Sequence, residues 1–310
     1  MSDTLEQFRQ TIFATLGYAP ADIDDDGAIH RFSTNGQHGD KSGYYVYHSD
    51  GIPAGFYGDW RTGLQSTWCA KSDNAMTPPE REANRQRIKA MAAQRDADKL
   101  ATQRQASEAA VKRWNAAATC IEHPYLKTKG VLGYGVRVEA DGFLVVPMLD
   151  TAGKLWNIER INPADFKDKR GLYGGRRTGL YHAIGGKPVD KLIVCEGYAT
   201  GASIHEATNW PVAVAFNASN VGPVAIALNM TYPDLTIVMA ADDDHRTFGN
   251  PGLSAARQAA LSVGGFVVMP QFPAGRPDKA TDFNDLYQLA GPQAVWACFF
   301  EIEGVVCGHY

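Results

Sequence analysis

The chain has 310 residues, of which 45% are hydrophobic and 21% charged, and its formal net charge is −4. This composition is typical of a folded chain of one or two domains, and it excludes collagen-like and broadly disordered proteins. No apolar run is long enough to predict a membrane span, and the first residues lack the apolar stretch of a secretory signal. We therefore expect a cytoplasmic protein with no membrane partner.

The cysteines do not predict a metal or disulfide framework. There are five of them, scattered along the chain without a CxxC pair. Zinc ribbons and disulfide scaffolds depend on regular cysteine spacing, so no zinc is expected.

Residues 1–76 are predicted to form a small mixed domain. A helix is expected over residues 4–16, and short strands near residues 29–32, 44–48 and 55–57 are separated by Gly, Asn and Asp turn residues. The segment carries five Lys and Arg against ten Asp and Glu. This charge opposes binding to a nucleic-acid backbone unless the basic residues share one face.

Aromatic residues in this segment allow two interpretations. They can stack on unpaired bases, as in single-strand binders, or they can fill the core. The core interpretation is favoured because a small domain has little other apolar material to bury. The aromatic residues are Tyr44, Tyr45, Trp60 and Trp68, and the basic residues that the stacking alternative would gather on one face are Arg31, Lys41, Arg61 and Lys71.

Residues 77–121 are predicted to be a helical linker. A long helix rich in Ala, Gln, Arg and Lys is expected to begin at Pro78 and to end near Ala118. Its few large apolar residues form a narrow seam, which favours a solvated helix. The alternative is a basic strut that touches nucleic-acid backbone, since residues 77–130 carry eleven Lys and Arg against six Asp and Glu.

Residues 122–188 are predicted to form a mixed α+β subdomain of basic character. Apolar residues 143–148 and 155–158 flank a turn at residues 150–153, which predicts a β-hairpin. A loop rich in Gly, Lys and Arg follows at residues 167–186.

Residues 189–310 alternate between short apolar strands and helices. This alternation predicts an α/β domain with a parallel sheet and helices on both faces. The expected strands are residues 192–195, 212–216, 235–240 and 266–269, and the expected helices are residues 199–208, 224–230 and 251–263.

Acidic side chains follow the ends of the predicted strands. Glu196 follows the first strand and Asp242 and Asp244 follow the third, while Asp282 and Asp285 stand in a loop before a further helix. The carboxyl ends of parallel strands meet at one crevice, where crowded carboxylates repel one another unless a divalent cation binds. Each acidic residue alone is more simply explained as a cap or turn residue, but together they predict a metal site.

Two of these motifs resemble those of the Toprim domain. Residues 194–198 read VCEGY and residues 238–244 read VMAADDD, which is similar to the glutamate motif and the DxD motif of that domain. Toprim domains occur in topoisomerases, DnaG-type primases and certain nucleases. Residues 280–286, and the segment that begins with residues 123–130, resemble the catalytic core of phage and plasmid primases.

The resemblance implies a DNA primase that makes short RNA primers on single-stranded DNA in phage or plasmid replication. One or two Mg²⁺ or Mn²⁺ ions would be held by Glu196, Asp242 and Asp244, with Asp282 and Asp285 as further carboxylates. The expected partners are single-stranded DNA, ribonucleoside triphosphates and a replicative helicase, either separate or fused at the C-terminus. The residues expected to bind nucleotide or phosphate are Arg160, Lys169, Arg170, Arg176, Arg177, Asn217 and Asn220.

Three features differ from the bacterial primases. Thr200 stands where an acidic residue often lies, no zinc ribbon precedes the core, and no helicase-docking domain follows it. Residues 1–76 are therefore the candidate for template binding. The alternatives are a Toprim nuclease and a non-catalytic single-stranded DNA-binding or regulatory protein, which Thr200 favours. The basic residues could equally form a solvated loop, and Asn217 and Asn220 could equally cap the next helix.

Overall fold

The computed structural model describes residues 2–72 and 76–305, and the chain divides into two compact units, Met1–Asp96 and Ala97–Tyr310. We call them the N-terminal unit and the C-terminal unit. The finer division expected from the sequence, at residues 76, 121 and 188, stays a prediction. The end of its last segment, residues 306–310, lies outside the described part of the chain.

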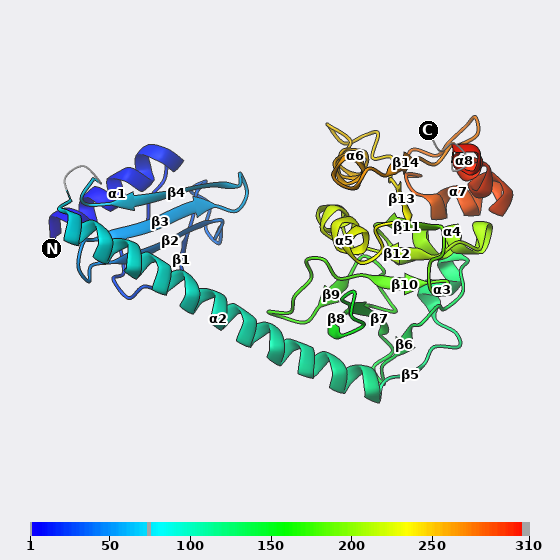
Figure 1. Ribbon diagram of the computed structural model, residues 1–310, viewed down its shortest axis with the longest axis horizontal. Helices are drawn as coiled ribbons and strands as arrows, with labels where there is room; N and C mark the ends of the chain where they lie inside the picture. The colour runs from blue at the N-terminus through cyan, green and yellow to red at the C-terminus, as the bar shows by residue number, and fades with distance from the viewer. Residues whose placement is uncertain (1, 73–75, 306–310) are drawn as a thin grey trace. The chain divides into compact units, whose positions relative to one another are not determined.

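The N-terminal unit is a four-stranded antiparallel sheet with one helix packed on it (Figure 1). Helix α1 (Ser2–Leu16) buries Phe8 and Ile12 against Tyr45, Tyr47 and Tyr57 of the sheet. Because side chains alternate between the two faces of a strand, these tyrosines share the helix-covered face. In the order of their pairing the strands are β1 (His30–Phe32), β2 (Gly43–His48), β3 (Ala54–Asp59) and β4 (Leu64–Cys69).

The helix and the three strands expected in this unit are confirmed, and β4 is an additional strand. The core interpretation of the aromatic residues is confirmed for Tyr44 and Tyr45, which are buried, and Trp68 packs partly buried against the same core as Tyr45. It is wrong for Trp60, whose side chain is 61% exposed. Trp60 comes directly after the end of β3. The alternation of side chains along the strand therefore no longer determines the direction of its side chain.

Helix α2 (Pro78–Ala116) is the long helix expected from the sequence. Most of its residues are exposed, which agrees with the solvated interpretation. Near its start Arg87 pairs with Asp50 in the N-terminal unit. Near its end Ala106, Ser107 and Ala110 are buried in the C-terminal unit, and the Ser107 hydroxyl donates to the carbonyl of Leu155 over 2.6 Å.

The first sheet of the C-terminal unit is antiparallel and contains the expected hairpin. Its side chains Val145 and Ile158 pack against Ala110 of α2. Helix α3 (Pro124–Lys129) precedes the hairpin, and Tyr125 and Leu126 anchor it in the core. In the order of their pairing the strands are β5 (Ala118–Thr119), β6 (Arg137–Val138), β7 (Leu144–Leu149), β8 (Leu155–Ile161) and β9 (Lys169–Gly171).

The second sheet of this unit has the predicted parallel core, with one antiparallel edge strand. Strands β12, β11, β13 and β14 run parallel, whereas β10, which the sequence analysis does not include, pairs antiparallel with β12. In the order of their pairing the strands are β10 (His182–Ile184), β12 (Val212–Val214), β11 (Lys191–Cys195), β13 (Thr236–Ala240) and β14 (Phe266–Val268).

Helices cover both faces of this second sheet, as the sequence predicts (Figure 1). Side chains alternate along β11, so Leu192 and Val194 pack with one group of helices and Ile193 and Cys195 with the other. One face carries α5 (Ala218–Thr231) and α6 (Pro251–Val263), and the other carries α4 (Tyr198–Thr208), α7 (Phe283–Ala290) and α8 (Pro292–Val305).

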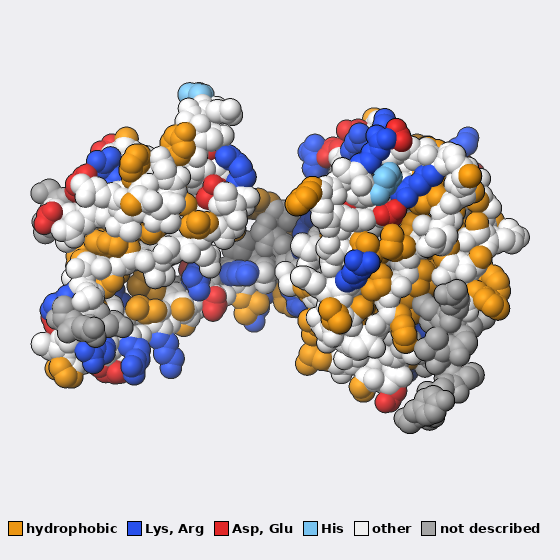
Figure 2. Space-filling model, turned by 90° about the horizontal axis from the view of Figure 1, so that it is seen from above, with side chains coloured by type: hydrophobic (Ala, Val, Ile, Leu, Met, Phe, Trp, Pro, Cys, Tyr) orange, Lys and Arg blue, Asp and Glu red, His pale blue; other side chains and the backbone are white. Residues whose placement is uncertain are grey.

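Charge is distributed rather than concentrated on the surface that Figure 2 shows. Lys and Arg side chains on that face are interspersed with Asp, Glu and apolar side chains. A localised electrostatic function therefore has to be sought in specific residues and not in the overall charge. Across residues 2–72 and 76–305, none of the helices combines the length and the apolar character needed to cross a membrane.

His182 is an ionisable side chain enclosed by the C-terminal unit. It is 3% exposed, its Nε2 atom lies 2.8 Å from the carbonyl oxygen of Tyr134, and its Nδ1 atom is buried without a hydrogen-bond partner in the described part of the chain. Burial lowers the pKa of His182 from 6.5 to about 4. The ring is therefore neutral in the folded protein at pH values where the unfolded chain already binds a proton.

We predict that this difference makes the free energy of unfolding fall as the pH is lowered from 6.5 to about 4. His182 contributes at most about 3 kcal/mol to the loss, from the size of the pKa change. Denaturant titrations across this pH range should give a shallower pH dependence for His182→Leu than for the wild type. Replacement of the exposed His38 by Gln is the control, and an unchanged slope in His182→Leu would contradict the prediction.

Candidate active site

Two parallel strands bring the predicted acidic residues to one edge of the second sheet. The last residues of β11 and β13 pair in register, so Glu196 and Asp242, which follow them, leave the sheet side by side. The backbone amide of Asp243 donates to the carbonyl of Thr281 over 2.8 Å. This hydrogen bond ties the loop before α7, and with it Asp282, to the same edge.

The carboxyl groups at this edge act on one another. Burial raises the pKa of Asp242 well above its ordinary value, and the charges of Asp282, Glu196 and Asp244 raise it further. Burial also raises the pKa of Glu196, and repulsion from Asp244 adds to this effect. Burial likewise raises the pKa of Asp282, and repulsion from Asp285 adds to it. Charges that act on one another in this way lie close together at this edge of the sheet.

Asp282 and Asp285 hold each other at the start of α7. Oδ1 of Asp282 accepts a hydrogen bond from the backbone amide of Asp285 over 2.8 Å, and Oδ2 of Asp285 accepts from the amides of Thr281 and Asp282 over 2.7 and 3.3 Å. This reciprocal arrangement is a capping box, so the cap interpretation of Asp282 is confirmed. The cap also fixes both carboxyl groups beside the crevice.

Thr200 lies against this cap in the interior of the protein. It is 1% exposed, and its hydroxyl donates to Oδ2 of Asp282 over 3.2 Å. A neutral donor therefore stands at the position where the primase resemblance expects a carboxylate. The hydroxyl lowers the pKa of Asp282, whereas a carboxylate there would add to the repulsion.

Asp243, the middle residue of the acidic triplet, binds Arg276 and Asn250. Asp243 is paired with Arg276, whose Nη1 atom lies 2.6 Å from its Oδ2, and it accepts a hydrogen bond of 2.7 Å from Asn250. Arg276 also donates to the carbonyl of Ala280 over 2.8 Å. Arg276 thereby links the loop after β13 to the loop before α7. This link helps to position the carboxylates that the two loops carry.

Asp242 and Asp244 both lie against the start of α6. Oδ2 of Asp244 accepts a hydrogen bond of 3.0 Å from the backbone amide of Gly252, in the first turn of α6. A Cβ atom at Gly252 would lie 2.8 Å from the carbonyl oxygen of Asp242. Only glycine lets the start of α6 approach the two aspartates this closely.

The backbone beside Glu196 is held in an unusual conformation. Phe216 donates its amide to the carbonyl of Glu196 over 2.8 Å and has a φ of 72°, a left-handed value that bulky residues rarely adopt. Asn217 follows it and caps α5 by accepting from the amide of Asn220 over 3.0 Å. The backbone amide of Ala218, in the first turn of α5, lowers the pKa of Glu196, so this helix end faces the glutamate.

The first sheet of the unit contributes basic side chains to the crevice. The ammonium of Lys169, on β9, lowers the pKa of both Glu196 and Glu159, and Arg177 lowers that of Glu159. Lys169 is exposed and therefore accessible to a ligand. The loop that carries Arg177 is pinned by Asn157, which donates to the carbonyl of Arg176 over 3.0 Å.

Glu159 is a residue of this crevice that sequence reasoning missed. It lies on β8, is 5% exposed, and burial raises its pKa. The signal that could have found it is a glutamate close to two buried isoleucines, Ile158 and Ile161, in the run LWNIERI, because a strand rarely buries an acid without a reason.

The other predicted phosphate ligands have partners within the protein. Arg160 pairs with Glu139 and Asp141, and Arg170 pairs with Asp168, so their charges are already offset. Arg176 donates to the carbonyl of Thr178 over 3.1 Å and lies over the ring of Trp156.

The buried amide of Asn220 has a structural task. It accepts a hydrogen bond from the amide of Gly179 over 2.8 Å and donates to the carbonyls of Leu180 and Ala215 over 3.0 and 2.8 Å. The helix-cap alternative fits Asn217, and Asn220 joins the basic loop to the second sheet.

The donor set fits a hard divalent cation. Carboxylate oxygens are the ligands that Mg²⁺ and Mn²⁺ prefer, and Oδ1 of Asp242 is buried without a hydrogen-bond partner among the described residues. In the same part of the chain, no three His, Cys, Asp or Glu side chains converge closely enough to enclose an ion by themselves. Water or substrate oxygens would therefore have to complete the coordination, as is usual for Mg²⁺.

The fold and the acidic edge together define the class of domain. Residues 191–293 match the profile of the Toprim domain family. This part of the chain is a Toprim domain, which confirms the resemblance of the glutamate and DxD motifs.

Two curated relatives are DNA primases. One DNA primase TraC of Escherichia coli is 35% identical over an alignment of 266 residues that covers 81% of this chain and 24% of the relative. A second DNA primase TraC of Escherichia coli is 34% identical over an alignment of 263 residues that covers 80% of this chain and 18% of the relative. The chain thus spans less than a quarter of the length of these curated relatives.

Solved primase structures also match. The DnaG primase catalytic domain bound to ssDNA gives a TM-score of 0.43 at 13% identity, covering 66% of this chain and 82% of that one. The Aquifex aeolicus primase, with its zinc-binding and RNA polymerase domains, gives a TM-score of 0.41 at 13% identity, covering 97% and 84%.

Thr200→Val tests whether the hydroxyl supports the acidic cluster. This change keeps the shape and removes the donor to Asp282, so we predict a loss of about 1–2 kcal/mol in the free energy of unfolding. Thr200→Ser should keep most of the stability. Thr231→Val, at an exposed helix position, is the matched control. The prediction is wrong if the Thr200→Val and Thr231→Val proteins have the same denaturation midpoint.

Proposed function

We propose that this chain is a DNA primase, which synthesises short RNA primers from ribonucleoside triphosphates on a single-stranded DNA template. The observation that carries the proposal is the group of mutually repelling carboxylates at the edge of β11 and β13, with Lys169 facing Glu196. A site that joins several carboxylates to an accessible cation suits nucleotidyl transfer, because the substrate is itself a metal-bound polyphosphate. The similarity to DNA primase TraC supports the same activity.

The acidic residues would hold one or two Mg²⁺ or Mn²⁺ ions. Glu196, Asp242 and Asp244 are the proposed ligands, with Asp282 and Asp285 as further carboxylates beside them. When bound, the metal would supply Lewis-acid chemistry, lowering the pKa of the attacking 3′-hydroxyl and offsetting charge on the triphosphate.

The remaining roles fall to side chains of this chain alone. Lys169 would bind the triphosphate through charge-assisted hydrogen bonds, with Arg177 next to it. Arg276 would act as a positioning residue, since it holds Asp243 away from the other carboxylates. Glu159 would keep Lys169 oriented by its charge. Duplex unwinding would be the task of a replicative helicase.

A primer-synthesis assay tests the proposal. Mixed-sequence single-stranded DNA, labelled ribonucleotides and Mg²⁺ or Mn²⁺ should yield short labelled oligomers with the wild type. Asp242→Asn and Glu196→Gln should lower this activity by about a hundredfold or more, because each removes a metal-ligand charge without changing the shape.

The matched control lies just before the same strand. Asp234 is exposed and precedes β13, at the opposite edge of the sheet, so Asp234→Asn should keep wild-type activity. Absence of product with either metal on varied templates would refute the proposal. Shortening of the DNA in the absence of nucleotides would instead indicate a nuclease.

Lys169→Gln tests the proposed triphosphate contact. Loss of one charge-assisted hydrogen bond should raise the KM for ribonucleotides by about tenfold, with a much smaller change in kcat. Lys187→Gln removes an exposed lysine of the same unit and should leave KM unchanged. An equal KM in the Lys169→Gln enzyme and the wild type would rule out the contact.

A further inference from the structure

The two faces of the N-terminal sheet have different characters. Helix α1 covers the face that carries Tyr45 and Tyr57. The row formed by Arg31, Tyr44 and Gln65 across β1, β2 and β4 lies on the opposite face, since these residues alternate with the helix-covered ones. Trp60, an exposed aromatic residue of the unit, packs on Tyr44 of this second face.

Trp60 is an exposed indole supported from within the sheet. It is 61% exposed, and the ring of Tyr44 lies beneath it with 4.7 Å between the ring centroids. Tyr44 can lie flat there because β3 has a glycine opposite: a Cβ atom at Gly58 would stand 2.5 Å from the Tyr44 hydroxyl oxygen. The backbone amide of Trp60 donates to the carbonyl of Ser42 over 3.0 Å, so the indole starts from a fixed backbone.

Arg31 lies over the indole, and Lys41 belongs to the backbone segment that Arg31 and Trp60 both contact. The guanidinium of Arg31 lies 5.3 Å from the centroid of Trp60, and its Nη1 atom donates to the carbonyl of Lys41 over 3.2 Å. Among the described residues neither Arg31 nor Lys41 is paired with a carboxylate. Both side chains are exposed, so their charges are available to a phosphate.

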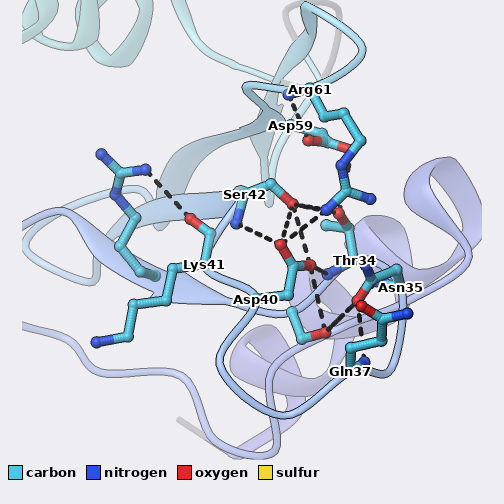
Figure 3. A network of polar contacts seen from close by, with 10 residues as sticks. Thr34, Asn35, Gln37, Asp40, Lys41, Ser42, Asp59 and Arg61 are labelled. Atoms are coloured by element: carbon cyan, nitrogen blue, oxygen red, sulfur yellow. Dashed lines mark hydrogen bonds and ion pairs between the residues drawn. The ribbon is translucent and has the colours of Figure 1, made fainter. Parts of the chain in front are cut away.

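The carboxylates nearby are already engaged (Figure 3). Although burial raises it, hydrogen bonds from Thr34 and Ser42 and the charge of Arg61 lower the pKa of Asp40 to about 2. Asp59 accepts from the Thr34 hydroxyl over 3.1 Å and from the amide of Arg61 over 2.8 Å. Lys41 points away from this network in Figure 3. At this place the charges of Asp40 and Asp59 are therefore held within the network, whereas the charge of Lys41 faces outward.

We propose that Trp60, together with Arg31 and Lys41, is a binding site for an unpaired base and its phosphate in single-stranded nucleic acid. A supported aromatic ring near cations that no carboxylate offsets is what stacking and backbone binding require. The site lies in the N-terminal unit, outside the Toprim domain, and it does not depend on the proposed catalytic activity.

The test measures binding and primer synthesis on the full-length chain. The probe is a fluorescein-labelled homothymidine oligonucleotide, followed by anisotropy, with a homouridine oligoribonucleotide as a second arm. Trp60→Ala should weaken binding roughly tenfold through the loss of one stacked base, and Trp60→Phe should recover most of the affinity. Lys41→Gln should make the dependence of the affinity on salt less steep by about one phosphate contact.

Phe13→Ala is the matched control. Phe13 is also 61% exposed and also lies in the N-terminal unit, but on the helix α1. Photocrosslinking to an oligonucleotide that contains 5-iododeoxyuridine locates the contact independently, because trypsin releases Trp60 in the peptide of residues 42–61. A crosslink in this peptide supports the site.

Several results would overturn the inference. The first is an equal affinity of Trp60→Ala and the wild type for the oligonucleotide, and the second is an equal loss of affinity in Phe13→Ala. The others are complete displacement of the oligonucleotide by duplex DNA and the absence of a crosslink in residues 42–61. The failure of this site is distinguishable from the failure of the proposed function. Suppose that Asp242→Asn abolishes primer synthesis, whereas Trp60→Ala changes neither primer synthesis nor the affinity for the template. The proposed primase function would then stand, and only the binding site at Trp60 would be refuted.

Discussion

Repulsion between carboxyl groups is the constraint on which the rest of the C-terminal unit depends. Burial and neighbouring charges raise the pKa of Asp242, Glu196 and Asp282, so the folded chain holds these groups together against their electrostatic preference. The contacts around them are what make this arrangement possible. A capping box fixes Asp282, and an ion pair to Arg276 removes the charge of Asp243 from the cluster. Strained or repelling groups persist only where the surrounding structure determines their positions.

The first and second sheets of the C-terminal unit share one hydrophobic core. Tyr198 of α4 accepts a hydrogen bond from the amide of Tyr134 over 2.6 Å and donates to the carbonyl of Leu132 over 3.0 Å. Asn284 of α7 donates to the carbonyl of Lys129 over 2.7 Å. The side chains of both sheets pack in the same cluster. The basic and acidic walls of the crevice are therefore positioned by packing and not by their mutual attraction.

The sequence predicted the parts of this architecture that depend on local pattern. Alternating apolar strands and helices indicated the sheet and its two covered faces, and the one-residue spacing of Asp242 and Asp244 indicated a shared side. It could not predict contacts between distant residues. The local sequence suggests that Arg160 is a solvent-facing cation, but in the fold it pairs with Glu139, which follows β6. The antiparallel strand β10 and the buried amide of Asn220 depend in the same way on segments far along the chain.

The N-terminal unit shows why charge summed over a segment is a poor guide to what the segment can bind. Residues 1–76 carry twice as many acidic as basic residues, which by itself opposes contact with a polyanion. Binding depends on the field at one place, and that field depends on which charges are already offset. Asp40 and Asp59 accept hydrogen bonds from Thr34 and Arg61, whereas Lys41 projects from the same turn. The turn thus presents the exposed charge of Lys41 within an acidic segment, and only the fold reveals it.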